Sequence, residues 1–383
     1  MPEKNKTYKS ALKVNKGIEQ PPVINPVISK AISKQTNQLL DADTYFKGIL
    51  DGNRMMLSKA ITLIESTLPA HQEIAQKIIE KCLPHSGKSI RIGITGVPGA
   101  GKSTFIETLG TMLTGQGESL AVLAIDPSSR RSKGSILGDK TRMELLGANP
   151  RAFIRPSPSA GTLGGVARKT RETVILCEAA GFRIIFIETV GVGQSETAVH
   201  DMVDFFLLLM LAGAGDELQG IKRGIMEMAD AIAINKAEGD NMQKALLAKS
   251  QLENALHYFP PSESGWKPVV EVCSALNNTG IDKIWQIISD YVHFTRSNNY
   301  FEKRRKSQDR KIMMDVVEET LMFQFRNNKK IAGMIREMED GLSRQKYSAY
   351  VAAQQLIESY FGDISKKDRE QDLKPSSVNN NED

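Results

Sequence analysis

The stretch RIGITGVPGAGKSTFIETL, residues 91–109, constrains the fold of this chain more than any other segment. Its Gly96-x-x-x-x-Gly101-Lys102-Ser103 spacing follows a short apolar run and precedes an amphipathic pattern, which is the strand–loop–helix setting of a phosphate-binding loop. Glycines there let backbone N–H groups turn toward phosphate oxygens. A glycine-rich turn of no function is the alternative, and the flanking patterns disfavour it. The candidate phosphate-binding residues are Gly96, Val97, Pro98, Gly99, Ala100, Gly101, Lys102, Ser103 and Thr104.

Seven short apolar runs alternate with helical patterns between Ser89 and Ala275. Their hydrophobicity is continuous rather than alternating, which is typical of strands buried on both faces of a parallel sheet. The sequence therefore predicts an α/β fold, a P-loop domain with a mostly parallel, doubly wound sheet. The runs are SIRIGIT, LAVLAID, AFIRP, RIIFIET, DFFLLLML, AIAIN and VVEVCSA.

Carboxylates stand at the ends of two of these runs, where ligand-binding residues of doubly wound sheets collect. Asp126 ends LAVLAID and Glu188 stands in IETVGVGQSE. Each could hold Mg²⁺ through water or orient an attacking water, although a helix cap is the plainer role for Asp126. Lys102 would reach the terminal phosphates while the Ser103 hydroxyl ligates the metal. The candidate metal ligands are Ser103, Asp126, Asp139 and Glu188, and a simple turn residue is the alternative for Asp139.

The segment after Glu188 resembles the Asp-x-x-Gly loop of GTPases, with Gly191 placed to contact the γ-phosphate. No Gln directly follows Gly191, so a residue that positions water in the usual place is missing. Gln194 stands three positions later and is a possible substitute. The glycines and the polar residues Gln194, Ser195 and Glu196 predict a loop that can rearrange when the γ-phosphate leaves. The candidate catalytic residues are Lys102, Asp126, Glu188 and Gln194.

The segment INKAEGDN, residues 234–241, resembles the Asn-Lys-x-Asp motif that reads guanine. Asn235 and Lys236 are followed by Glu238, one methylene longer than Asp, and Asp240 could replace it if the loop shifts. A carboxylate here accepts two hydrogen bonds from guanine, whereas adenine offers no such donor pair, so guanine is the better ligand. Ser274, Ala275 and Leu276 in CSALNNTG would contact the same base.

Composition and charge disfavour two kinds of partner, nucleic acid and a membrane, and indicate the cellular compartment. The formal net charge of +5 comes from 50 basic and 45 acidic residues, and seven lysines stand in the first 40 residues, so a nucleic-acid surface is not indicated. The longest apolar run is far shorter than the roughly 20 residues of a membrane helix. Three dispersed cysteines indicate buried thiols in a reducing compartment. We expect a cytoplasmic protein, or one of the mitochondrial matrix in a eukaryote.

Five segments are expected. Residues 1–42 form a disordered basic tail, 43–86 an N-terminal helical extension interrupted near Pro69, and 87–296 the P-loop domain. Residues 297–363 form a helical arm and 364–383 a disordered tail. The charge run at 302–311 is expected to be a solvated helix face. The apolar positions after it, which include Ile312, Val316 and Leu321, predict burial against a second copy of the chain.

Long motifs in this order resemble one family, the methylmalonyl-CoA mutase-associated GTPases of the MeaB type, also labelled ArgK or LAO/AO transport proteins. The resemblance spans about residues 45–350 and departs from the family pattern at Glu238, where Asp is usual. The motifs are GITGVPGAGKST, AIDPSS, GSILGDKTRM, RPSPSAGTLGGVA, IETVGVGQSE, GAGDELQGIKRGI and INKA.

The resemblance implies a GTPase that binds GTP, GDP and Mg²⁺, forms a homodimer, and acts as a chaperone for a B12-dependent acyl-CoA mutase. It places Gln219 and Lys222 in an additional switch that answers to this mutase. Two alternatives are an ATP-dependent kinase or ATPase of amino-acid transport and a metallochaperone GTPase. The base loop disfavours the first, and the scattered His and Cys residues disfavour the second.

Overall fold

The computed structural model describes residues 39–126, 143–158, 163–189, 195–212 and 223–372. Most of the tail expected over residues 1–42 lies outside these ranges, as do residues 373–383. The helix that ends the chain continues past residue 363 to Asp372, so the structured arm is longer than the sequence predicted.

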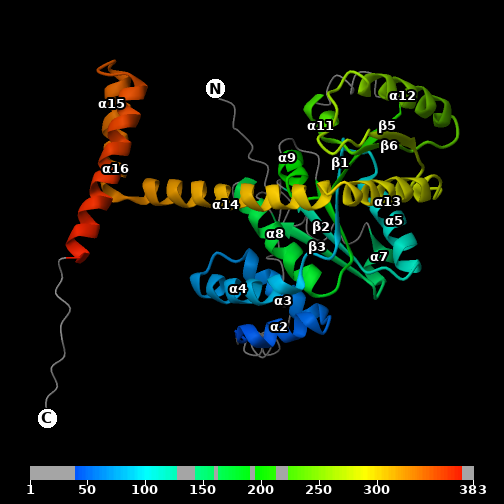
Figure 1. The fold of residues 1–383 in the computed structure, drawn as a ribbon, viewed down its shortest axis with the longest axis horizontal. Helices are drawn as coiled ribbons and strands as arrows, with labels where there is room; N and C mark the ends of the chain where they lie inside the picture. Colours follow the sequence, from blue (N-terminus) through cyan, green and yellow to red (C-terminus); the bar gives the residue numbers. More distant parts are fainter. Residues whose placement is uncertain (1–38, 127–142, 159–162, 190–194, 213–222, 373–383) are drawn as a thin grey trace, which may run out of the picture.

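A seven-stranded sheet forms the centre of the molecule, with strand order β3-β2-β4-β1-β5-β6-β7 (Figure 1). Every neighbouring pair is parallel, which confirms the predicted sheet. The strands are β1 (Ile90–Gly96), β2 (Leu120–Asp126), β3 (Ala152–Pro158), β4 (Ile184–Thr189), β5 (Phe205–Leu211), β6 (Ala231–Asn235) and β7 (Val269–Val272). The continuous apolar runs become strands because both faces of this sheet are covered.

Two apolar cores cover the two faces of the sheet. Phe186 of β4 packs in one core with residues of α5 (Lys102–Gly115) and α13 (Ile281–Ser297). Its neighbour Ile185 packs in the other, with α3 (Arg54–Glu65), α4 (Pro69–Cys82), α8 (Leu163–Ala179) and α9 (Ser195–His200). Successive strand side chains point to opposite faces, so one strand contributes to both cores. Cys82, Cys177 and Cys273 are buried thiols, as predicted.

Shorter helices complete the sheet domain. Helix α7 (Glu144–Ala148) precedes β3 and α11 (Arg223–Met228) precedes β6. Helix α12 (Asn241–Leu256) lies between β6 and β7 and contributes to a third apolar cluster over β5 and β6.

The N-terminal extension contains α2 (Ala42–Leu50), α3, α4 and the short 3-10 turn Leu83–His85. The predicted interruption lies at Ser66–Leu68, and Pro69 begins α4 at the first helical position, where its missing N–H costs no hydrogen bond. A further break separates α2 from α3. Asn53 caps α3 by accepting hydrogen bonds from two backbone amides of its first turn.

Beyond the sheet domain, α14 (Tyr300–Asn327) leaves as one long helix, and α15 (Lys329–Ser343) and α16 (Ala349–Asp372) lie across its far end (Figure 1). Its first half packs on the sheet domain, where Phe301 and Gln308 are buried. Large apolar side chains on the second half are exposed, among them Met313, Val317, Leu321 and Phe323.

The charge run at 302–311 is not a fully solvated face, which corrects the sequence prediction. Arg304 pairs with Asp230 at 3.3 Å, and Arg305 pairs with Asp204 at 2.7 Å. Both arginine side chains keep only about a tenth of their surface exposed, 10% and 11% respectively. A charge pattern alone could not reveal this, because the two acids precede β6 and β5 and are distant in sequence.

Candidate functional site

The loop between β1 and α5 has the backbone that its glycines predicted. Gly96, Gly99 and Gly101 all have positive φ angles, of 155°, 81° and 82°. A Cβ at Gly96 would lie 2.2 Å from the Leu209 carbonyl oxygen, and one at Gly101 would lie 2.8 Å from Asn235 Nδ2. The loop therefore requires glycine for both its conformation and its close packing.

Lys102 begins α5 and folds back over this loop. Its Nζ donates hydrogen bonds to the carbonyl oxygens of Gly96 at 2.9 Å and Val97 at 3.3 Å. Burial lowers the pKa of Lys102, against the raising effect of the Glu188 and Glu196 carboxylates. The ammonium group is thus held beside backbone N–H groups that face a phosphate in loops of this type.

Ser103 and Glu188 meet at the end of the sheet. The Ser103 hydroxyl donates to Glu188 Oε1 at 3.3 Å, and the Glu188 residue is buried. The parallel pairing of β1 with β4 places Glu188 opposite Ile94, two residues before Gly96. A hydroxyl and a carboxylate oxygen are the hard ligands that Mg²⁺ takes, so these two groups fit the predicted metal.

The structure describes only the backbone of one further predicted site residue, and several others lie outside the described ranges. Asp126 is the last residue of β2, as expected, but its side chain is not among those described. Asp139, Gly191, Gln194, Gln219 and Lys222 lie outside the described ranges. Within the described part of the chain, no group of three or more His, Cys, Asp or Glu could hold a metal ion.

Asn235 at the end of β6 joins three loops. Its Nδ2 donates to the Ala100 carbonyl oxygen at 2.8 Å, and its Oδ1 accepts from the Ala275 amide at 3.0 Å. Lys236 follows with a left-handed backbone, φ 59°. The asparagine therefore fixes the phosphate loop, its own loop and the loop after β7 relative to one another.

Glu238 contacts the loop after β7. The Ser274 hydroxyl donates a hydrogen bond to its carboxylate, and the Asn277 amide donates to the same hydroxyl oxygen at 3.0 Å. Leu276 beside them is exposed. Asp240 instead occupies the position before α12. The longer carboxylate is thus the acid tied to Ser274.

Two features of this site escaped the sequence reasoning. Glu196, expected in a loop, lies in α9 and is only 7% exposed. Thr189 and Thr95 are both buried, and the Thr189 hydroxyl donates to Thr95 Oγ1 at 2.8 Å, joining β4 to β1 directly behind the loop. Nothing in the local sequence Gly-Gln-Ser-Glu predicts that Glu196 is buried. Its burial results from the packing of α9 on β1 and β4.

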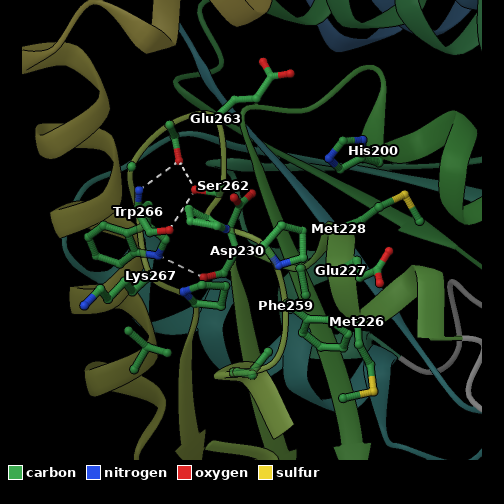
Figure 2. A pocket seen from close by; sticks show the side chains of 18 of the residues that line it. His200, Met226, Glu227, Met228, Asp230, Phe259, Ser262, Glu263, Trp266 and Lys267 are labelled. Atoms are coloured by element: carbon green, nitrogen blue, oxygen red, sulfur yellow. Dashed lines mark hydrogen bonds between the residues drawn. The ribbon is translucent and has the colours of Figure 1, made fainter.

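A large cavity, about 1020 Å³, lies elsewhere and contains none of the predicted nucleotide residues (Figure 2). Asp230 and Val269, at the amino ends of β6 and β7, line it, so it opens at the edge of the sheet opposite the phosphate loop. Trp266 Nε1 donates to the Asp230 carbonyl oxygen at 3.0 Å, and Figure 2 shows His200 on the opposite wall.

Across the ranges that the structure describes, no helix combines the length and apolar character needed to cross a bilayer.

Known proteins match this chain along most of its length. The family model for "Methylmalonyl Co-A mutase-associated GTPase MeaB" matches residues 57–330. The "GTPase ArgK" of Escherichia coli is 46% identical over 271 residues, which cover 71% of this chain and 82% of that protein. The mouse protein "Methylmalonic aciduria type A homolog, mitochondrial" is 43% identical over 328 residues, 83% of this chain and 79% of that one.

A solved structure described as a LAO/AO transport system kinase has a TM-score of 0.70 and 35% identity, covering 84% of this chain and 99% of that one. This similarity supports the fold described above, and the name of the Escherichia coli relative identifies that protein as a GTPase. The chain therefore belongs to the methylmalonyl-CoA mutase-associated GTPase family and is a P-loop GTPase.

Proposed function

We propose that this GTPase is a chaperone for a B12-dependent acyl-CoA mutase, methylmalonyl-CoA mutase or a relative, and that GTP hydrolysis gates cofactor loading and protection. One observation carries the proposal: a phosphate loop with a half-buried Lys102 and a Ser103–Glu188 pair lies in a chain whose family is named for association with this mutase. The name of the mouse relative, which refers to methylmalonic aciduria, supports the same partner.

In this proposal the chain's own residues bind and orient the triphosphate. Lys102 leaves the carbonyl oxygens of Gly96 and Val97 and donates to the terminal phosphates. Backbone N–H groups of Val97 and residues 99–104 surround the phosphate oxygens. When bound, Mg²⁺ would neutralise phosphate charge, and Ser103, Asp126, Asp139 and Glu188 are the residues proposed to hold it directly or through water. Gln194 remains our candidate for orienting the attacking water.

Guanine selection is proposed to rest on Glu238. Its carboxylate is held by Ser274, and it offers two acceptor oxygens to a base with adjacent N–H donors. Adenine would leave those oxygens unpaired, which is costly in a partly buried site. This geometry favours GTP over ATP and so disfavours the transport-kinase alternative, whose name belongs to a structural relative.

The partner is proposed to act through Gln219 and Lys222, and the arm to form a homodimer. The site lacks a glutamine directly after Gly191, so hydrolysis by the isolated protein should be slow. A mutase that orders the switch residues would accelerate it. We place the protein in the cytoplasm, or in the matrix of a eukaryote, since the mouse relative's name is mitochondrial.

The test is a single-turnover GTPase assay with and without the mutase from the same organism. We expect acceleration of up to about 10³-fold, the lower end of what partner-supplied groups contribute in GTPases. Lys222→Ala should lose most of this response, whereas Lys244→Ala, an exposed lysine on α12, should respond like the wild type. No response at saturating mutase, or a full response of Lys222→Ala, would refute the proposal.

A further inference from the structure

Helix α9 extends from the phosphate site to the base of the arm. Its second residue, Glu196, is buried, and its carboxylate interacts electrostatically with Lys102. The helix starts at Ser195, a short distance along the chain from Glu188. One end of α9 is therefore next to the position where the terminal phosphates bind.

The other end of α9 contacts α14. The carboxylate of Asp201, the residue directly after α9, forms an ion pair with Lys311 of α14. Its carbonyl oxygen accepts a hydrogen bond from Arg171 of α8. The same arginine donates through Nη1 to the Gln308 carbonyl oxygen at 3.5 Å, so α8, α9 and α14 meet at this point.

The base of α14 is only partly enclosed. The 1020 Å³ cavity borders this junction, with His200 and Asp201 lining one part and Lys303, Arg304 and Gln308 another. Within the described residues, Nη2 of Arg304 is buried without a hydrogen-bond partner. Unpaired buried donors are rare in folded proteins. A different position of α14 would therefore allow Arg304 Nη2 to gain a hydrogen-bond acceptor. Open space beside the helix gives it room to move.

Movement at this junction would be enlarged along the arm. Residues 312–327 of α14 extend beyond Lys311 and are mostly exposed, and they carry α15 and α16. Sixteen helical residues span about 24 Å, so a tilt of about 10° at Lys311 would displace the far end by about 4 Å.

We propose that α9 couples the nucleotide state to the orientation of the arm, through Glu196 at the phosphate site and the Asp201–Lys311 contact at α14. A γ-phosphate brings negative charge toward the buried Glu196 carboxylate and draws Lys102 away from it. Like charges in a poorly solvated site repel, so α9 shifts when GTP replaces GDP. Asp201 moves with α9 and α14 pivots beside the cavity. The inference rests on GTP binding and requires no mutase.

The experiment measures the distance between two spin labels, at Gln116→Cys on the sheet domain and Arg326→Cys near the far end of α14. Both positions are exposed, and the three native cysteines are buried, so the labels attach to the introduced thiols. Labelled chains are diluted with unlabelled ones to isolate distances within one chain. We expect the distance to differ by about 4 Å between GDP and a non-hydrolysable GTP analogue, each with Mg²⁺.

Lys311→Met should abolish most of this difference, and Lys306→Met, which removes a charge from the same helix, should keep it. Coupling is reciprocal, so Lys311→Met should also change the ratio of GTP-analogue to GDP affinity by about fivefold or more. A wild-type distance that is the same with both nucleotides would overturn the proposal. A full shift in Lys311→Met with an unchanged affinity ratio would overturn it equally. Neither result bears on the mutase, because none is present.

Discussion

The sheet domain and the arm differ in where their apolar side chains lie. In the sheet domain, residues such as Phe105, Phe186 and Ile284 are fully or almost fully buried within one chain. On the arm, Leu321 and Phe323 keep 48% and 69% of their surface exposed. Monomeric proteins rarely present large contiguous apolar surfaces. The first region therefore buries its apolar side chains within one chain, whereas the second leaves large apolar side chains exposed, and the homodimer that we propose would cover them.

The largest expected effect concerns the ion pair between Arg91 of β1 and Glu178 of α8. The Glu178 side chain is 0% exposed and accepts hydrogen bonds from Arg91, Ser89 and the Gly87 amide. Glu178→Ala leaves the Arg91 guanidinium in a buried place without its counter-charge. We expect unfolding free energy to fall by about 3–5 kcal/mol, measured by urea denaturation. A loss below about 1 kcal/mol would mean that solvent reaches this pair readily.

The second prediction concerns the chemistry of the phosphate loop. Lys102→Ala removes the ammonium group that stabilises charge developing on the phosphates. GTP turnover should fall by at least about 10²-fold, the effect of losing one preorganised electrostatic contact. The matched control is Lys244→Ala on α12, which should keep the wild-type rate. If purified Lys102→Ala turns over GTP normally, this loop is not the catalytic one.

The third prediction concerns the base loop. Ser274→Ala removes the hydroxyl that holds the Glu238 carboxylate. Hydrogen bonds to charged groups contribute about 1.5–3 kcal/mol, so GDP affinity should fall by about tenfold or more while weak ADP binding stays unchanged. Glu238→Asp should retain or sharpen the preference for guanine. Fluorescent-nucleotide titration measures both, and equal binding of GTP and ATP by the wild type would exclude guanine selection.

The smallest effect is expected on the arm. Asp340 of α15 and Arg344, the residue directly after this helix, form an ion pair at 3.0 Å, but their side chains are 57% and 63% exposed. Exposed pairs on a helix contribute about 0.3–0.5 kcal/mol, so Asp340→Ala should barely change the unfolding free energy. The same urea denaturation used for Glu178→Ala provides the direct comparison. A loss comparable to that of Glu178→Ala would show that the arm packs far more tightly than its exposure indicates.

The sheet and the phosphate loop could be predicted from the sequence because local rules determine them. Buried parallel strands are continuous apolar runs, and Gly96 and Gly101 occupy positions where only glycine fits. These features depend on spacing that a single sequence displays. The hydrogen bond between Asn235 and the Ala275 amide, by contrast, is a finding of the structure that the motifs did not predict.

Long-range pairing could not be predicted in this way. Arg304 and Arg305 resembled a solvated run, yet they pair with acids about 70 and 100 residues earlier in the chain. Glu196 looked like a loop residue, and only the packing of α9 on the sheet buries it. Tertiary contacts between distant segments decide both outcomes, and no local pattern encodes them.

The contrast between the buried core of the sheet domain and the exposed apolar side chains of the arm is tested most directly by the mass of the protein in solution. Light scattering should give twice the 42.3 kDa chain mass for the wild type. The double substitution Leu321→Asp and Phe323→Asp should produce a monomer that turns over GTP at the wild-type basal rate. The same change at Leu246 and Leu247, exposed residues of α12, should leave the dimer intact. A wild-type protein that stays monomeric at every concentration, or an arm variant that remains dimeric, would contradict the assembly proposed for the arm.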